Sequence, residues 1–320
     1  MTPVRFTAGV SKRVKRGIFR MSVSDKTLEE LAEESREQEK ERYVKKCGEF
    51  QREIFQATEE VFRELAEASN NFRDVDIDFV RENPITVRIL RYLTEPILSR
   101  DKFSEYCDVG DQTLRKYEDY EDDTTPQPNT AEKIIGTFEE FRNETLLPWL
   151  EVEQMEYHEY DEETLVKKLQ TAIAYNIATS EANTEYRNWR ATIQHDAIND
   201  ELFEAGFEKV NVDDVDEIGP GEYVLELSVE GKEADFAIRN RDSDLFLVEA
   251  KMSGTEINFH KRRKEMIDDY NDWTDGRPDS EIVAVIGGVI DTDDVERLEE
   301  VGITVFWDHE LDGLSDFLEA

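Results

Sequence analysis

Cysteine is nearly absent from this sequence: Cys47 and Cys107 are the only two among 320 residues. They lie far apart and in no metal-type spacing, which excludes a disulfide framework and a cysteine-ligated zinc module. A chain without disulfides is typical of a reducing compartment such as the cytoplasm. No apolar run approaches the roughly 20 residues that a membrane-spanning helix needs. We therefore expect a cytoplasmic protein that makes no membrane contact.

Basic residues are also scarce, with 39 Lys and Arg against 77 Asp and Glu and a formal net charge of -38. This excess of acid suits a protein that binds basic partners or mimics DNA. It equally suits a protein of a very salty, halophilic cytoplasm, where carboxylates keep the surface hydrated. The acids are spread along the whole chain, which favours the salt interpretation. In molar salt the Debye length falls to about 3 Å, so the net charge does not exclude double-stranded DNA as a partner.

The N-terminal part of the chain divides into two segments of different charge. Residues 1–23 start with a run that is rich in Lys and Arg and free of acid, and they predict a disordered basic arm that could contact DNA. Met21 could equally be the true start of the protein. In residues 24–83 apolar residues recur at mixed spacings of three and four, which predicts long amphipathic helices. These helices would form either the wall of a bundle or a coiled-coil arm in a homodimer.

Residues 84–148 are expected to form short helices separated by turns. Ser99 is placed to cap one helix, and a turn at Val109-Gly110-Asp111 leads into another that starts near Gln112. After an acidic loop, Asn129 or Thr130 is expected to cap the next helix. Two short helices around a Gly-containing turn are the plan of a helix-turn-helix.

This segment resembles the helix-turn-helix of Cro and repressor proteins over about 60 residues. The match is carried by apolar or aromatic residues at Phe103, Val109 and Tyr117, with Glu118 after the last of these. It departs at Tyr106 and Cys107, which are larger than the family's usual Ala. The resemblance implies a recognition helix in the major groove, led by Asp111, Gln112, Thr113, Arg115 and Lys116. The alternative is a helical packing domain that has kept this shape without binding DNA.

Residues 149–183 predict an acidic helical connector, and residues 184–320 a separate α/β domain. In the latter, a helix over 185–205 is followed by three short strands joined by tight turns, "EYVLELSV", "ADFAIRN" and "LFLVEAKM". A helix, the buried strand "IVAVIGGV", a further helix and the strand "ITVFW" complete the domain. This order predicts a mixed sheet with helices on both faces. The fold class is therefore α+β and multidomain, with a helical N-terminal half.

The end of the third strand combines a carboxylate with an ammonium group. Side chains alternate along a strand, so Glu249 and Lys251 share one face while Val248 and Ala250 take the other. The turn before this strand lets Asp235 on the neighbouring strand approach Glu249. Two carboxylates that meet at a sheet edge repel each other unless a hard cation such as Mg²⁺ (or Mn²⁺) lies between them. Lys251 would then orient the attacking water.

These residues resemble the PD-(D/E)XK nuclease superfamily, which includes restriction endonucleases. The match is carried by Asp235, by Glu249-Ala250-Lys251 after an apolar strand, and by the order of helices and strands over about 130 residues. The resemblance implies a restriction-endonuclease-like fold in which Asp235, Glu249 and Lys251 are catalytic and the first two bind Mg²⁺. The family's usual Pro is replaced by Ala234.

Two further features of this superfamily are partial. Its first helix often supplies a metal ligand, for which His195 and Asp196 are both candidates. Its second helix often carries Gln-x-x-x-Tyr, but here Met266 stands in place of the Gln before Tyr270. The run "HKRRK" in that helix is the most basic stretch of the domain, and Lys261, Arg262 and Arg263 are expected to contact the DNA backbone. The alternative for these three is a solvated helix face.

Three functions remain open at this point. The first is a Mg²⁺-dependent DNA endonuclease, by analogy related to restriction or defence, in which the helix-turn-helix selects the DNA. The second is a DNA-binding transcriptional regulator with a degenerate, non-catalytic nuclease domain. The third is an interaction protein whose acidic helices bind partners or dimerise.

Overall fold

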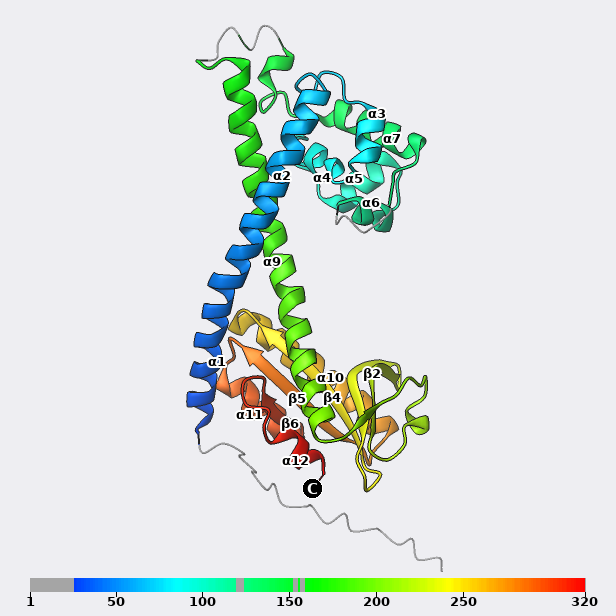
Figure 1. The fold of residues 1–320 in the computed structure, drawn as a ribbon. Coiled ribbons are helices and arrows are strands. Elements are labelled where there is room, and N and C mark those ends of the chain that lie inside the picture. Colours follow the sequence, from blue (N-terminus) through cyan, green and yellow to red (C-terminus); the bar gives the residue numbers. More distant parts are fainter. Residues whose placement is uncertain (1–25, 119–123, 152–154, 156–158, 320) are drawn as a thin grey trace, which may run out of the picture. The chain divides into compact units, whose positions relative to one another are not determined.

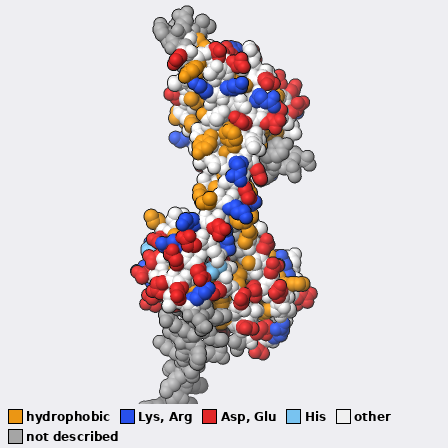
Figure 2. Space-filling model, turned by 60° about the vertical axis from the view of Figure 1, so that its left-hand side comes forward, with side chains coloured by type: hydrophobic (Ala, Val, Ile, Leu, Met, Phe, Trp, Pro, Cys, Tyr) orange, Lys and Arg blue, Asp and Glu red, His pale blue; other side chains and the backbone are white. Residues whose placement is uncertain are grey.

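The computed structural model describes residues 26–118, 124–151, 155 and 159–319. The expected basic arm over residues 1–23 therefore lies outside the described residues. The chain forms two compact units: Lys40–Arg190 is one, and Ala191–Ala320 together with the N-terminal residues up to Glu39 is the other. Among the helices in the described ranges, none is long and apolar enough to cross a membrane. On the face shown in Figure 2, acidic side chains are scattered over both units rather than gathered in one region.

Long helices open the described chain. Helix α1 (Leu28–Arg42) continues through one π-helical turn, η1 (Tyr43–Cys47), into α2 (Gly48–Ala68). Helix α9 (Glu162–Glu204) is longer still, at 43 residues. We expected a break near residue 183 between a connector and a new helix, and this was wrong. No Gly or Pro interrupts the segment, so nothing in the local chain chemistry ends the helix there.

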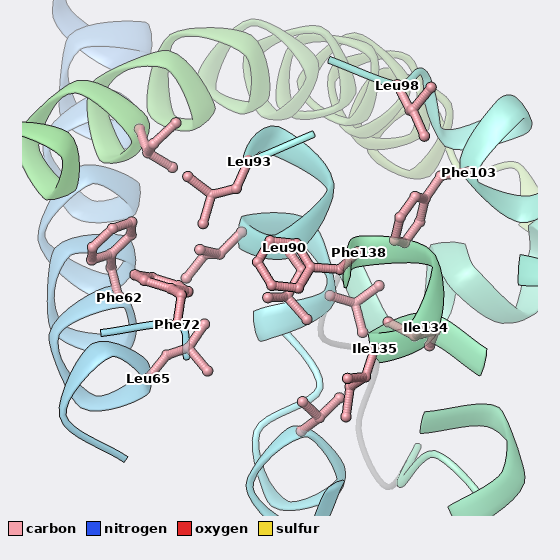
Figure 3. Close-up of a cluster of buried hydrophobic side chains, with 14 of the residues drawn as sticks. Phe62, Leu65, Phe72, Leu90, Leu93, Leu98, Phe103, Ile134, Ile135 and Phe138 are labelled. Carbon is pink, nitrogen blue, oxygen red and sulfur yellow. The ribbon is translucent and has the colours of Figure 1, made fainter. Parts of the chain in front are cut away.

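The unit Lys40–Arg190 packs five shorter helices around one apolar core: α3 (Ile77–Glu82), α4 (Thr86–Tyr92), α5 (Arg100–Cys107), α6 (Asp111–Glu118) and α7 (Pro128–Phe141). A 3-10 turn, η2 (Pro148–Leu150), follows them. Figure 3 shows Phe62 and Leu65 from α2 meeting Leu90 from α4 and Phe138 from α7 in this core. Helix α7 is capped by Gln127 with Pro128 as its first residue. The expected caps Asn129 and Thr130 thus lie inside the helix, because Pro is favoured at the first helical position.

The other unit is built on a six-stranded mixed sheet in the order β1-β2-β3-β4-β5-β6. Its strands are β1 (Glu208–Lys209), β2 (Glu222–Val229), β3 (Lys232–Arg239), β4 (Leu245–Ser253), β5 (Glu281–Gly288) and β6 (Thr304–Trp307). Strands β2, β3 and β4 form an antiparallel meander, and β4, β5 and β6 run parallel to one another. The prediction of a mixed sheet in the C-terminal half is confirmed.

Helices cover both faces of this sheet (Figure 1). On one face, Phe259 and Trp273 of α10 (Glu256–Gly276) and Leu298 of α11 (Thr292–Val301) pack with Leu31 of α1. On the other face, the last turns of α9 pack with α12 (Leu314–Leu318). Helix α12 and the short turn η3 (Val215–Glu217) were not expected from the sequence. The sheet is thereby buried on both sides and offers a rigid frame for side chains at the ends of its strands.

Candidate active site

Strand β4 separates its side chains onto two faces as alternation requires. Val248 and Ala250 belong to the apolar cluster on the face covered by α9 and α12. Glu249 and Lys251 therefore point to the opposite face. The side chain of Glu249 is only 7% exposed and that of Lys251 21%. A carboxylate and an ammonium group are thus held beside each other in a largely dry environment.

The structure brings Asp235 of β3 to the same place. Its Oδ2 accepts a hydrogen bond of 2.7 Å from the backbone N–H of Ala250, and the Lys251 Nζ lies 3.5 Å from this oxygen. Lys251 also forms a short ion pair with the Oε1 of Glu249. One ammonium group therefore lies beside two carboxylates from neighbouring strands. The structure brings Asp235, Glu249 and Lys251 together; from the sequence we expected a divalent cation, rather than Lys251, between the two carboxylates.

Burial and charge set the ionisation of this cluster. Burial raises the pKa of Glu249 from its ordinary value of 4.5 to about 7; the Lys251 charge opposes the rise and the Asp235 charge adds to it. Burial alone would lower the pKa of Lys251, but the carboxylates of Glu249 and Asp235 outweigh it, so that the pKa is raised. Lys251 is consequently a charged ammonium at neutral pH, whereas Glu249 gives up its proton near neutrality.

Of the two first-helix candidates, only His195 reaches the cluster. Its Nε2 lies 3.7 Å from the Oδ1 of Asp235, and its ring packs edge-on against Phe236 with the centroids 5.5 Å apart. The part of α9 next to His195 is held against strand β5, because the side chain of Gln194 donates a hydrogen bond of 3.1 Å to the backbone carbonyl of Val285. Asp196, the next residue, is exposed to solvent.

The residues present fit a divalent cation with few protein ligands. The Oε2 of Glu249 is buried and accepts no hydrogen bond in the described structure, so a negative oxygen without a donor is available. The Oδ1 of Asp235 faces His195. No cluster of three or more His, Cys, Asp or Glu suited to a metal occurs in the described ranges. A pair of carboxylates nevertheless suits Mg²⁺, which keeps several waters and takes one or two carboxylates from a protein.

The basic run on α10 is divided between surface and interior. Lys261 and Arg262 are exposed, and both pair with Glu265, at 3.6 and 2.9 Å. Arg263 is instead buried, with its guanidinium bound to the carboxylate of Asp294 on α11. Arg263 is therefore not on the face that Lys261 and Arg262 offer to solvent. Its partner lies 31 residues further along the chain, which no local pattern reveals.

Helix α10 also places two charged residues near the cluster: Arg262, which the sequence predicts only as a DNA contact, and Asp269, which the sequence reasoning missed. The charge of Arg262 opposes the protonation of Lys251, and the charge of Asp269 helps to raise the pKa of Glu249. Asp269 itself binds Lys232 at 2.9 Å. Glu265 and Asp269 follow Arg262 at the three- and four-residue spacing of one helix face, and this spacing is the signal that could have identified Asp269.

Helices α5 and α6 flank a tight turn in the other unit. Asp108 ends α5 in the left-handed conformation with φ 49°, and the Ser104 hydroxyl donates a hydrogen bond of 2.5 Å to the Val109 carbonyl. Leu114 and Tyr117 are buried in the core, while the predicted DNA-contacting residues of α6 are exposed: Gln112, Thr113, Arg115 and Lys116. Glu118 is buried and bound by Arg91 through two hydrogen bonds of 2.6 and 2.9 Å. The exposed face of α6 is thus polar and basic, and its inner face is fixed.

Comparison with known proteins gives one family. The family model described as XamI restriction endonuclease matches residues 70–307. No curated protein matches the chain. Among solved structures, one described as the crystal structure of protein VC1899 from Vibrio cholerae is 13% identical with a TM-score of 0.25. The match covers 75% of this chain and 55% of that one, a remote likeness in which the chain spans little more than half of the other protein.

Proposed function

This chain belongs to the XamI restriction endonuclease family, and from that premise we propose that it is a metal-dependent endonuclease that hydrolyses phosphodiester bonds of double-stranded DNA. The observation that carries the proposal is the meeting of Asp235, Glu249 and Lys251 at the end of β4. Restriction of foreign DNA is the biological role that the family name suggests.

Asp235 and Glu249 would hold Mg²⁺ or Mn²⁺, with His195 beside Asp235 as the contribution of the first helix. When bound, such an ion stabilises negative charge on the scissile phosphate and favours ionisation of water. Support for this role comes from the free Oε2 of Glu249, which is buried without a donor in the described structure. A buried acceptor of this kind is costly unless a cation or donor satisfies it.

Lys251 acts as a hydrogen-bond donor and not as a base, because its raised pKa keeps it protonated. An ammonium group has three N–H donors. Glu249 takes one of them, and Asp235 lies 3.5 Å from the ammonium as an ion-pair partner. A remaining N–H is available to orient the attacking water. In the reaction, the water oxygen forms a bond to phosphorus and releases a proton to solvent. The bond from phosphorus to the leaving oxygen breaks on the opposite side, with inversion, and that oxygen takes up a proton.

DNA would be held by two surfaces of exposed cations. On α10, Lys261 and Arg262 are exposed, and the charge of Arg262 acts on Lys251, so we assign them to phosphates near the cleaved bond. On α6, we propose a helix-turn-helix recognition helix in which Gln112 and Thr113 read base edges while Arg115 and Lys116 contact phosphate or guanine. The short helix pair and the buried Leu114 and Tyr117 support this assignment.

A plasmid-cleavage assay tests the proposal. The full chain is purified in high salt, given Mg²⁺ or Mn²⁺, and compared with Lys251→Ala and with a chelated sample. We expect cuts with the wild type alone and only in the presence of the ion. If the wild type cuts no DNA, or if Lys251→Ala cuts equally well, the endonuclease assignment is overturned. Retained DNA binding without cleavage would instead indicate a regulator, and loss of both would indicate an interaction protein.

A further inference from the structure

The ladder between β2 and β3 is interrupted at one position only within its length. Register pairs run without a gap from Glu222 with Arg239 to Leu225 with Phe236, and resume at Leu227 with Ala234. The omitted pair is Glu226 and Asp235. The regular ladder is therefore interrupted at Asp235, the residue that carries the proposed catalytic carboxylate.

The side chains of β2 change faces at the same point. Tyr223 and Leu225 pack on the face covered by α9 and α12, whereas Leu227 and Val229 pack on the face covered by α10 and α11. Residues two apart on a regular strand share a face. The backbone must accordingly turn over between Leu225 and Leu227, which is at Glu226.

Glu226 makes this turn with a left-handed backbone. Its φ is 53° in the middle of a strand, a conformation that residues with a Cβ seldom adopt and that is frequent for Gly and Asn. The side chain is exposed and makes no hydrogen bond or ion pair in the part of the chain that the structure describes. The position therefore has its effect through the main chain and not through the carboxylate.

The consequence is seen on the far side of β3. The β3–β4 ladder ends at Phe236 with Val248, and beyond this pair the Ala250 N–H donates to the Asp235 side chain at 2.7 Å. The left-handed turn at Glu226 thus coincides with the place where β3 parts from β4 and the Asp235 carboxylate enters the gap. Strand irregularities of this kind re-aim side chains beside active sites.

We propose that Glu226 is a positioning residue whose left-handed backbone aims the Asp235 carboxylate at Ala250 and at the Glu249–Lys251 pair. The inference rests on the proposed nuclease function for its catalytic consequence, but its geometric part is independent of activity. It assigns a role in the reaction to a residue of β2, a strand that supplies no group to the site itself.

The test compares three variants of the full chain. Glu226→Val is β-branched and disfavours the left-handed conformation, while Glu226→Gly adopts it freely. Glu230→Val is the control, because Glu230 is an exposed Glu of the same hairpin with the same φ of 53° but lies in the turn after β2. Unlike Glu226, it also forms an ion pair of 3.5 Å with Arg277. All three remove the same charge. Thermal unfolding shows which variants are folded, and the backbone amide resonance of Ala250 in the metal-free protein reports its hydrogen bond to Asp235.

We expect Glu226→Val to lower kcat by about 10²-fold, as small displacements of reacting groups do, with little change in KM and a shifted Ala250 amide. Glu226→Gly and Glu230→Val should cleave within about threefold of wild type with an unchanged amide. The proposal is overturned if Glu226→Val resembles Glu230→Val in both readouts, or if Glu226→Gly is as impaired as Glu226→Val. If the wild type itself does not cleave, the nuclease function fails, and the Ala250 amide alone decides whether Glu226 aims Asp235.

Discussion

The carboxylate of Asp235 accepts its hydrogen bond from the backbone N–H of Ala250, at 2.7 Å. In a regular antiparallel ladder this N–H would bond a main-chain carbonyl of the neighbouring strand, so a side chain has taken the place of the main chain. One oxygen of Asp235 is thereby fixed on the protein. The other, Oδ1, lies on the side of His195 and is the oxygen that a cation can use.

Replacing Asp235 by Asn should separate folding from chemistry. The Asn carbonyl can still accept from Ala250, so the unfolding temperature should remain near that of the wild type. The negative charge is lost, and we expect the cleavage rate to fall by at least about 10²-fold, as when a group that stabilises the transition state is removed. Plasmid cleavage and thermal unfolding measure the two effects. Asp196→Asn, a change at an exposed carboxylate on α9, is the control; full activity of Asp235→Asn would remove Asp235 from the site.

Strand β4 and the meeting of Glu249, Lys251 and Asp235 were predictable because the pattern that places them is local. The apolar run before Glu249 predicts a buried strand, and alternation places Glu249 and Lys251 on one face. A tight turn then brings Asp235 alongside. The bend at Glu226 was not predictable, since Glu has no preference for the left-handed region that it occupies here. Only the register of the finished sheet reveals it.

Two helical features also depend on tertiary contacts that the sequence does not show. The lack of Gly and Pro from Glu162 to Glu204 favours one long helix, but the change in pattern near residue 184 predicts a domain boundary there, and the helix runs through it. The burial of Arg263 depends on Asp294, which belongs to another helix. A run of basic residues cannot show which of them faces inward.

The pKa of Glu249 predicts how Mg²⁺ affinity depends on pH. In the metal-free protein this pKa is raised from 4.5 to about 7, and the cation binds the ionised form. Below pH 7 binding must first remove a proton, so the apparent Kd should rise about tenfold for each pH unit of acidification and stay level above pH 7. Calorimetric titration with Mg²⁺ between about pH 5.5 and about pH 8.5 measures this.

The same shift affects the fold in the absence of metal. The folded protein keeps the Glu249 proton up to about pH 7, whereas the unfolded chain releases it near 4.5. The contribution of this group to the unfolding free energy is therefore greatest at low pH and declines as the pH rises through that window.

The control for the Mg²⁺ titration is Glu249→Gln, which cannot ionise and should bind Mg²⁺ weakly at every pH. A wild-type Kd that does not change between pH 6 and pH 7 would contradict the assignment of Glu249 as a ligand.

Neighbouring arginines on α10 should have opposite effects when truncated. Arg263 is buried and bound to Asp294, so Arg263→Ala leaves a buried carboxylate with one partner fewer and should cost about 3–5 kcal/mol of unfolding free energy. Arg262 is exposed and, among the residues that the structure describes, forms an ion pair only with Glu265, so Arg262→Ala should cost less than about 1 kcal/mol. Arg262→Ala should instead weaken DNA binding. Urea unfolding and DNA affinity are measured on both variants. The prediction is contradicted if Arg263→Ala destabilises the fold less than Arg262→Ala does.

The exposed face of α6 gives a test of DNA reading by the unit Lys40–Arg190. If Arg115 and Lys116 each contact a phosphate, Arg115→Ala and Lys116→Ala should each reduce the slope of log Kd against log salt by about 0.9. Gln112→Ala should leave that slope intact and relax the preference for one DNA sequence over another, because it removes a base contact. Lys167→Ala, which removes an exposed cation from α9, controls for the general loss of positive charge. Equal slopes for all three basic variants would show that α6 does not contact DNA.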